Sequence, residues 1–211
     1  MKKAFAIAAV AGLAGAASAQ TMHISADVTS AMASDTITWT VSITGLSLQT
    51  IGGTTIGGDY LQGYDLNFVA SNAALGDASA FSAFAGSVSP TGGTPAGASI
   101  NGVTGGQSSI LGGVAYGNLV IGTFTVHAGA VAGDLSYGLA DGGILSETNA
   151  IQVKNYDFFA GAGVPNGDFG DDVFNGVPQV VSDTVTITAV PTPASAALIG
   201  LGGLVATRRR R

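Results

Sequence analysis

The stretch that decides the fold class is DTITWTVSIT, residues 35–44. Its apolar side chains, Ile37, Trp39, Val41 and Ile43, alternate strictly with the hydroxyl-bearing residues Thr and Ser. Successive side chains of a β-strand point to opposite faces of the sheet, so this period of two predicts a strand with one face in a core and the other in water. The chain is therefore expected to contain a sheet that is apolar on one side.

Segments with the same alternation recur along the chain, separated by pairs of glycines. The 33 glycines and the abundant Ser, Thr, Ala and Val suit tight turns and strands better than helices. Many short strands with glycine-rich connections favour an all-β fold, an antiparallel β-sandwich of the jelly-roll kind. Clear strands are expected at residues 64–68, 118–128 and 184–188, and weaker ones at residues 23–28, 134–139 and 150–155.

Two segments do not fit the strand pattern. Residues 71–85 are rich in alanine, and one or two helical turns capped by Ser71 or Asp77 are expected there. Residues 87–106 are rich in Gly, Ser, Thr and Pro, a composition that favours a long loop carrying a short strand.

The first 19 residues have the layout of a secretory signal peptide. The chain begins with the positive sequence MKK and continues with an uncharged apolar run at residues 4–16. Ala17 and Ala19 then fit the small-x-small rule of signal peptidase, and Gln20 becomes the first mature residue. Residues 1–19 are therefore expected to form a signal helix that signal peptidase removes during export.

The last residues, 190–211, have three parts in a fixed order. A turn at Pro191-Thr192-Pro193 leads into an apolar stretch at residues 194–206, where a short helix is expected. Spanning a bilayer takes about 20 apolar residues, so this stretch is too short for a permanent anchor. It can still pause in the membrane with its basic end inside, because moving arginine across lipid is costly. That basic end consists of Arg208, Arg209, Arg210 and Arg211.

This three-part tail resembles the bacterial PEP-CTERM sorting signal, which a membrane protease-transpeptidase called exosortase is thought to process. The family pattern is a Pro-x-Pro motif, an apolar stretch and an arginine cluster, and this chain matches at residues 191–193, 194–206 and 208–211. Thr192 stands where the commonest form has Glu, which leaves the exosortase subtype open. The resemblance covers about a tenth of the chain and implies export, transient membrane anchoring through the tail and an exosortase-like partner.

The middle of the chain, residues 20–189, is expected to form one β-sandwich domain. About 170 residues are enough to bury a sizeable core, and without any cysteine the stability must come from that core. Two strand-and-turn patterns resemble those of cohesin-like surface modules: residues 63–68 followed by 72–75, and residues 121–126 followed by 133–135. This resemblance, over about a third of the chain, implies a jelly-roll-like fold and carries no binding residues across.

The charge of the mature segment excludes several classes of partner. Six of the seven basic residues lie in the two end segments, which leaves Lys154 against 13 acidic residues and a net charge of about −12. Such a surface repels nucleic acid and anionic lipid and keeps an exported protein soluble.

Candidate catalytic residues are few. Nucleophilic catalysis needs a serine beside a base, but no Gly-x-Ser-x-Gly motif is present, and His23 and His127 each lie in or beside an expected strand. Glu147 is the one glutamate and is expected on the surface. We therefore expect no enzymatic activity.

One acidic cluster could bind calcium, although no cofactor is required by the sequence. Flexible loops of Asp, Asn and Gly can supply the oxygen ligands that calcium takes. The turn chemistry of Asn-Gly pairs explains the same cluster equally well, so both interpretations stay open. The cluster consists of Asn166, Asp168, Asp171 and Asp172.

Together these features predict a non-enzymatic surface or extracellular-matrix protein, displayed on the cell or released into a polysaccharide layer. The alternative is a carbohydrate- or protein-binding adhesion module, with calcium as an optional ligand. Aromatic side chains lying together on an outer face would favour sugar binding, and their burial would favour a scaffold. The candidates are Tyr60, Tyr64, Tyr116, Tyr137, Tyr156, Phe158 and Phe159.

Overall fold

A computed structural model describes residues 20–51, 53–107, 117–143, 150–156 and 172–190, and strands dominate these residues. The expected signal helix at residues 1–19 and the short apolar helix of the tail lie outside them. No helix in the described part of the chain is long and apolar enough to cross a membrane. The elements in chain order are β1 (Thr21–Ala26), β2 (Ser30–Met32), β3 (Thr36–Thr44), β4 (Leu48–Ile51), β5 (Thr54–Ala70), the 3-10 turn η1 (Ala73–Leu75), β6 (Gly76–Ala78), β7 (Ser82–Ala83), β8 (Thr91–Ala96), β9 (Ser99–Gly106), β10 (Leu119–Ala128), β11 (Gly133–Leu135), β12 (Tyr137–Asp141), β13 (Ile151–Tyr156), β14 (Asp172–Gly176), β15 (Gln179–Ser182) and β16 (Val185–Thr188).

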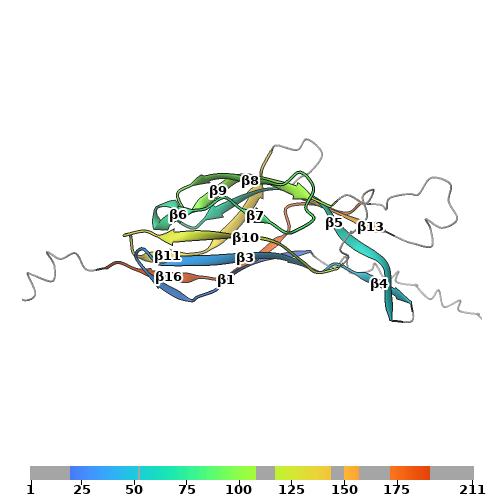
Figure 1. The fold of residues 1–211 in the computed structure, drawn as a ribbon, viewed down its shortest axis with the longest axis horizontal. Coiled ribbons are helices and arrows are strands. Elements are labelled where there is room, and N and C mark those ends of the chain that lie inside the picture. Colours follow the sequence, from blue (N-terminus) through green and yellow to red (C-terminus); the bar gives the residue numbers. More distant parts are fainter. Residues whose placement is uncertain (1–19, 52, 108–116, 144–149, 157–171, 191–211) are drawn as a thin grey trace, which may run out of the picture.

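The strands form a two-layered sandwich. The first sheet has the order β15-β1-β3-β10-β6, and β7 also pairs with β10. The second sheet has the order β14-β13-β5-β9-β8, and both β12 and β4 also pair with β5. In Figure 1 the strands β8 and β9 lie above β10, β3 and β1, and a small sheet of β11, β16 and β2 continues the lower layer.

The core lies between the two sheets, as the alternation in β3 predicts. Buried and outward-facing residues alternate along the whole of β3, so Trp39 and its apolar neighbours on that strand face the second sheet. The Trp39 ring stacks on Phe124 with centroids 6.3 Å apart and meets Tyr137 edge-on at 4.8 Å. Aromatic pairs of this kind stabilise a core beyond the area that they bury.

The expectation of a purely antiparallel sandwich needs one correction. β15 runs parallel to β1, and β16 runs parallel to β2, so the last two strands return beside the first two in the same direction. Parallel neighbours need a long crossover connection, and here nearly the whole domain supplies it. Residue periodicity indicates which side of a strand is buried but not which strand lies beside it, so it does not predict this parallel pairing.

The alanine-rich segment 71–85 forms less helix than expected. Only η1 is helical, and its cap is Asn72, whose side-chain oxygen accepts a hydrogen bond from the backbone N–H of Ala74 at 3.0 Å. Beyond this turn the backbone pairs with the sheets instead: the N–H of Ser79 donates to the Thr125 carbonyl at 2.8 Å. These hydrogen bonds to the sheets pair the backbone N–H and C=O groups that a longer helix would otherwise pair, so extending the helix would gain no additional hydrogen bonds.

The expected loop at residues 87–106 is in fact a β-hairpin made by β8 and β9. Ile100 and Val103 of β9 are buried, which gives the hairpin an apolar side that packs on the core. The turn between the strands requires Gly97, because its φ is +59° and a Cβ there would lie 2.3 Å from the Ala73 carbonyl oxygen. The glycine-rich composition of residues 87–106 therefore reflects the tight turn of a hairpin rather than an open loop.

Candidate functional site

The outer face of the first sheet is lined by hydroxyl groups. The outward residues of β3 are Thr36, Thr38, Thr40, Ser42 and Thr44, and each is exposed or half-buried. The neighbouring strands continue this surface in register, because β10 sets Thr123 and Thr125, and β1 sets Thr21 and Ser25, beside β3. The centre of this face is therefore polar but uncharged.

The two histidines lie on this face but far from each other. His23 pairs across strands with Ser42, and His127 pairs with Thr36, which is six residues nearer the start of β3. At about 3.3 Å per residue these two positions are roughly 20 Å apart. Each imidazole instead hydrogen-bonds a threonine hydroxyl: His23 Nε2 lies 3.0 Å from Thr44 Oγ1, and His127 Nδ1 lies 2.9 Å from Thr36 Oγ1.

This geometry does not assemble a catalytic centre from the described residues. A nucleophile needs a base that is itself oriented by a third group. Neither histidine has a hydrogen-bonded carboxylate among the contacts that the structure describes, and the described residues contain no group of three His, Asp or Glu that could hold a metal ion. Glu147 lies outside the described residues.

The tyrosines with described side chains are buried. Tyr60 and Tyr64 are fully buried in β5, and the Tyr137 hydroxyl donates a hydrogen bond to the Ala98 carbonyl at 2.7 Å. Burial raises the pKa of both Tyr64 and Tyr137, although the Ser87 hydroxyl partly offsets this for Tyr64. These three rings are buried and cannot form a sugar-binding platform. The side chains of Tyr116, Tyr156, Phe158 and Phe159 lie outside the description.

Two buried aspartates were not singled out from the sequence. Asp59 is 3% exposed, and its Oδ2 accepts a hydrogen bond from the Ser47 N–H at 3.0 Å. Asp65 is fully buried, and the backbone of Gly142 approaches so closely that a Cβ there would meet Asp65 Oδ1. Position 142 therefore requires glycine, because any larger residue would clash with the Asp65 side chain. The residue alternation places Asp65 on the outward side of β5, but it does not reveal what covers that side.

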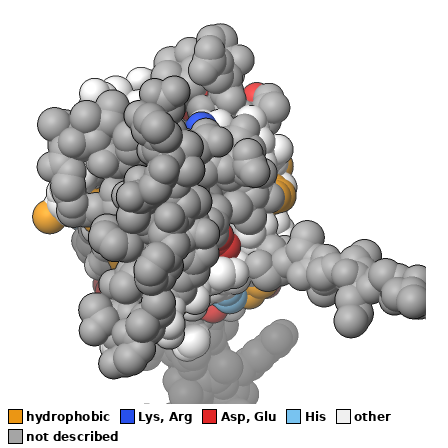
Figure 2. All heavy atoms as spheres, turned by 90° about the vertical axis from the view of Figure 1, so that its right-hand side faces the viewer, with side chains coloured by type: hydrophobic (Ala, Val, Ile, Leu, Met, Phe, Trp, Pro, Cys, Tyr) orange, Lys and Arg blue, Asp and Glu red, His pale blue; other side chains and the backbone are white. Residues whose placement is uncertain are grey.

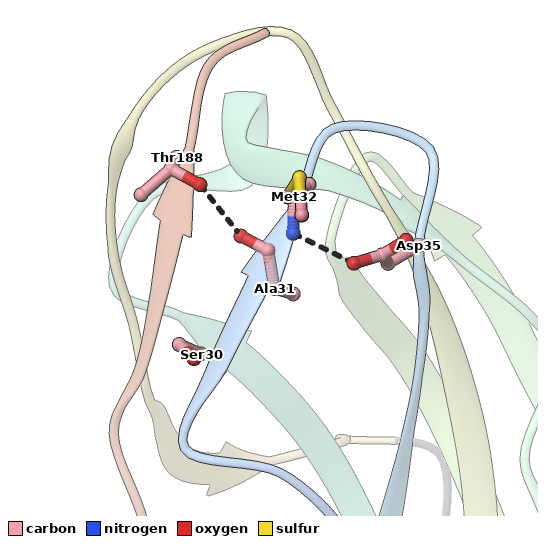
Figure 3. A pocket seen from close by; sticks show the side chains of 5 residues that line it. All are labelled: Ser30, Ala31, Met32, Asp35 and Thr188. Carbon is pink, nitrogen blue, oxygen red and sulfur yellow. Dashed lines mark hydrogen bonds between the residues drawn. The ribbon is translucent and has the colours of Figure 1, made fainter.

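A small hollow lies at the end of the domain where β16 finishes. Figure 3 shows its lining residues, and the cavity has a volume of about 220 Å³. The carboxylate of Asp35 accepts a hydrogen bond from the Met32 N–H at 2.7 Å, and the Thr188 hydroxyl donates to the Ala31 carbonyl at 3.3 Å. Ordinary small-molecule pockets start at about 300 Å³, so this hollow is small, and its only carboxylate closes a turn. The lining residues are Ser30, Ala31, Met32, Asp35 and Thr188.

Most residues that the sequence marks for processing or calcium binding lie outside the described part of the chain. The exceptions are Gln20, which is buried directly before β1, and Asp172, which begins β14 and pairs with Lys154 of β13. Those outside are Ala17, Ala19, Asn166, Asp168, Asp171, Pro191, Thr192, Pro193, Arg208, Arg209, Arg210 and Arg211.

The described residues thus define a β-sandwich domain with a hydroxyl-lined outer face. No protein-family model and no curated protein match the sequence. The solved structures to which the chain is similar include cohesin modules. A type I cohesin from Pseudobacteroides cellulosolvens has 8% identity and a TM-score of 0.49, over 82% of this chain and 95% of that one.

Two further cohesins are similar at the same low level. A type II cohesin from the cellulosome of Acetivibrio cellulolyticus has 13% identity and a TM-score of 0.42, over 79% of this chain and 95% of that one. A non-cellulosomal cohesin from the archaeon Archaeoglobus fulgidus has 14% identity and a TM-score of 0.39, over 84% of this chain and 96% of that one. These values are too low to assign the chain to that family or to transfer a ligand.

Proposed function

We propose that this chain is an exported, non-enzymatic surface or extracellular-matrix protein of bacteria. Signal peptidase removes residues 1–19, and an exosortase-like membrane protease processes the PEP-CTERM-like tail at residues 190–211. The sandwich domain, residues 20–189, is then displayed at the cell surface or released into an extracellular polysaccharide layer.

The observation that carries this proposal is where the tail motif begins relative to the last strand. β16 ends at Thr188, and Val190 is 56% exposed, directly before the Pro-x-Pro motif starts at Pro191. A protease needs a backbone that is free of a strand ladder, and the chain leaves the ladder of β16 just ahead of the motif. The uncharged hydroxyl face and the two separated histidines fit a scaffold better than an enzyme.

The proposal predicts that the native protein lacks both ends of the encoded chain. Mass spectrometry of protein taken from the cell surface and from the medium should find Gln20 as the first residue and none of Arg208, Arg209, Arg210 or Arg211. Replacing the four arginines with serine should leave unprocessed protein. Surface protein with an intact arginine cluster would refute processing, and intact chain residing in the cytosol would refute export.

The alternative function is a carbohydrate- or protein-binding adhesion module. The broad outer face of β1, β3 and β10 carries hydroxyl groups and two histidines but no Asp, Glu, Lys or Arg, which favours a neutral partner over a charged one. The burial of Tyr60, Tyr64 and Tyr137 counts against sugar stacking by those three rings.

Calcium dependence can be tested separately. We expect millimolar Ca²⁺ to leave the melting temperature of the native protein unchanged, because the sequence at residues 166–175 lacks the ordered Asp-x-Asp-x-Asp-Gly layout and the bidentate Glu of a calcium-binding loop. A ligand that binds only the folded state raises the melting temperature. Thermal unfolding with Ca²⁺ and with EDTA therefore decides the question: a rise with Ca²⁺ that the Asp168→Asn variant loses would assign a calcium site and favour the adhesion module.

A further inference from the structure

The residue directly before β1 lies on the core side of that strand. Met22 and Ile24 of β1 are fully buried, and Gln20 precedes them on the same side because side chains alternate along a strand. Gln20 is only 4% exposed. Glutamine is seldom buried without a hydrogen-bond partner, yet no hydrogen bond of the Gln20 amide is found within the described part of the chain.

The backbone beside Gln20 is held between two other strands. Thr21 pairs with Thr44 of β3 on one side and with Gln179 of β15 on the other. Figure 2 looks onto this end of the molecule, where β1 begins and β3 ends. The mature chain that the sequence predicts therefore starts within a sheet and does not begin as a free arm.

Cleavage before Gln20 would create an α-amino group at this position. Such a group has an ordinary pKa of about 7.7–8.0, so it is largely charged at neutral pH. Both this charge and the side-chain amide are unfavourable beside a core, because each loses contact with water there. A reaction that removes the charge and the free amide together would therefore favour the folded state.

An N-terminal glutamine can lose both groups by closing a ring on itself. The α-amino nitrogen attacks Cδ of the side-chain amide, so an N–Cδ bond forms and the Cδ–Nε2 bond breaks. Nε2 leaves as ammonia and takes the proton that the α-nitrogen gives up. The product is the neutral five-membered lactam pyroglutamate, and the attack is favoured because both reacting groups belong to one residue. The α-nitrogen keeps one N–H and remains a hydrogen-bond donor, as in a peptide.

We propose that Gln20 is a modification site, which cyclises to pyroglutamate once signal peptidase has released it, and that the sheet then shields the lactam. This inference rests on the proposed function, because it requires cleavage between Ala19 and Gln20. It goes further by assigning the chemical state of the mature N-terminus. The reaction uses atoms of Gln20 alone, so it needs neither a partner molecule nor a bound group.

The first test is mass spectrometry with stepwise N-terminal sequencing of native protein, analysed as soon as it is collected from producing cells. Nearly all wild-type molecules should begin at residue 20, lack one ammonia relative to the unmodified chain and be blocked to sequencing. Gln20→Asn is the matched control, because it keeps the amide but is one methylene too short to close a five-membered lactam. This variant should begin at the same residue with a free, readable amino group.

A second test measures the shielding. Pyroglutamyl aminopeptidase removes an accessible N-terminal lactam. It should act on the folded protein at least about tenfold more slowly than on an N-terminal peptide cut from the unfolded chain, because a residue held in a sheet must first open locally.

The outcomes separate this proposal from the proposed function. A free amino group on Gln20 in the native protein would overturn the proposal and leave signal cleavage intact. A lactam fraction that rises only on storage, or equal removal rates from folded protein and peptide, would also overturn it. A native chain that begins at any other residue would refute the cleavage site and the proposal with it.

Discussion

Replacing Trp39 with alanine should destabilise the domain by roughly 3–5 kcal/mol, which is the usual cost of truncating a buried aromatic side chain. Trp39 is fully buried at the centre of β3, where its ring stacks on Phe124 and meets Tyr137 edge-on. Alanine would leave a cavity between the two sheets that these rings cannot fill without moving. A native domain is stable by only about 5–15 kcal/mol, so this loss is large.

The measurement is urea unfolding followed by circular dichroism, together with the melting temperature, which should fall by roughly 10 °C. Thr40→Ala is the matched control, since Thr40 follows Trp39 on β3 but points to the outer face. Its effect should be well below 1 kcal/mol. Trp39→Phe should destabilise less than Trp39→Ala, because it keeps a ring and removes a buried indole N–H that has no hydrogen-bond partner among the described residues. Equal stability of the alanine variant and wild type would contradict the described core.

The strands that can be predicted best from the sequence are those with one buried face and one face exposed to solvent. The alternation in β3 and β10 reflects burial on one side, so these elements could be predicted with nearly correct bounds. For β8 and β9 the composition predicts only a long loop with a short strand, because a hairpin rich in glycine has few side chains to show a period. The parallel placement of β15 beside β1 depends on the return path of the chain, which periodicity does not encode.

The features of the candidate sites also fall into two groups: those that local sequence predicts and those that depend on how the strands pack. Processing segments at both ends can be proposed from the sequence alone, because the features that predict them are local: a charge block, an apolar run and a short motif. The buried state of Asp65 and of Tyr60 could not be foreseen, since it depends on what covers the outward side of β5.

The domain should also lose stability steeply above pH 10, because two buried tyrosines must stay protonated in the folded state. Burial raises the pKa of Tyr64 and of Tyr137 above the ordinary value of 10.0. Their stabilising contribution is fully present below the pKa of the unfolded chain and is lost as the pH rises through the folded pKa, since the unfolded chain then releases protons that the folded one retains. Between the pKa of the unfolded chain and that of the folded protein, each tyrosine should lower the free energy of unfolding by about 1.4 kcal/mol per pH unit.

Urea unfolding at pH 8, 9.5, 10.5 and 11 measures this loss, and absorbance at 295 nm reports when the phenols ionise. Tyr137→Phe separates the two effects of that residue. It should lower stability at pH 8 by about 1–3 kcal/mol, because the buried Ala98 carbonyl loses its donor. It should also make the decline above pH 10 shallower, since one titrating phenol is gone. Equal stability at pH 9.5 and pH 11, with all phenols titrating near pH 10 in the folded protein, would show that these tyrosines are accessible to water.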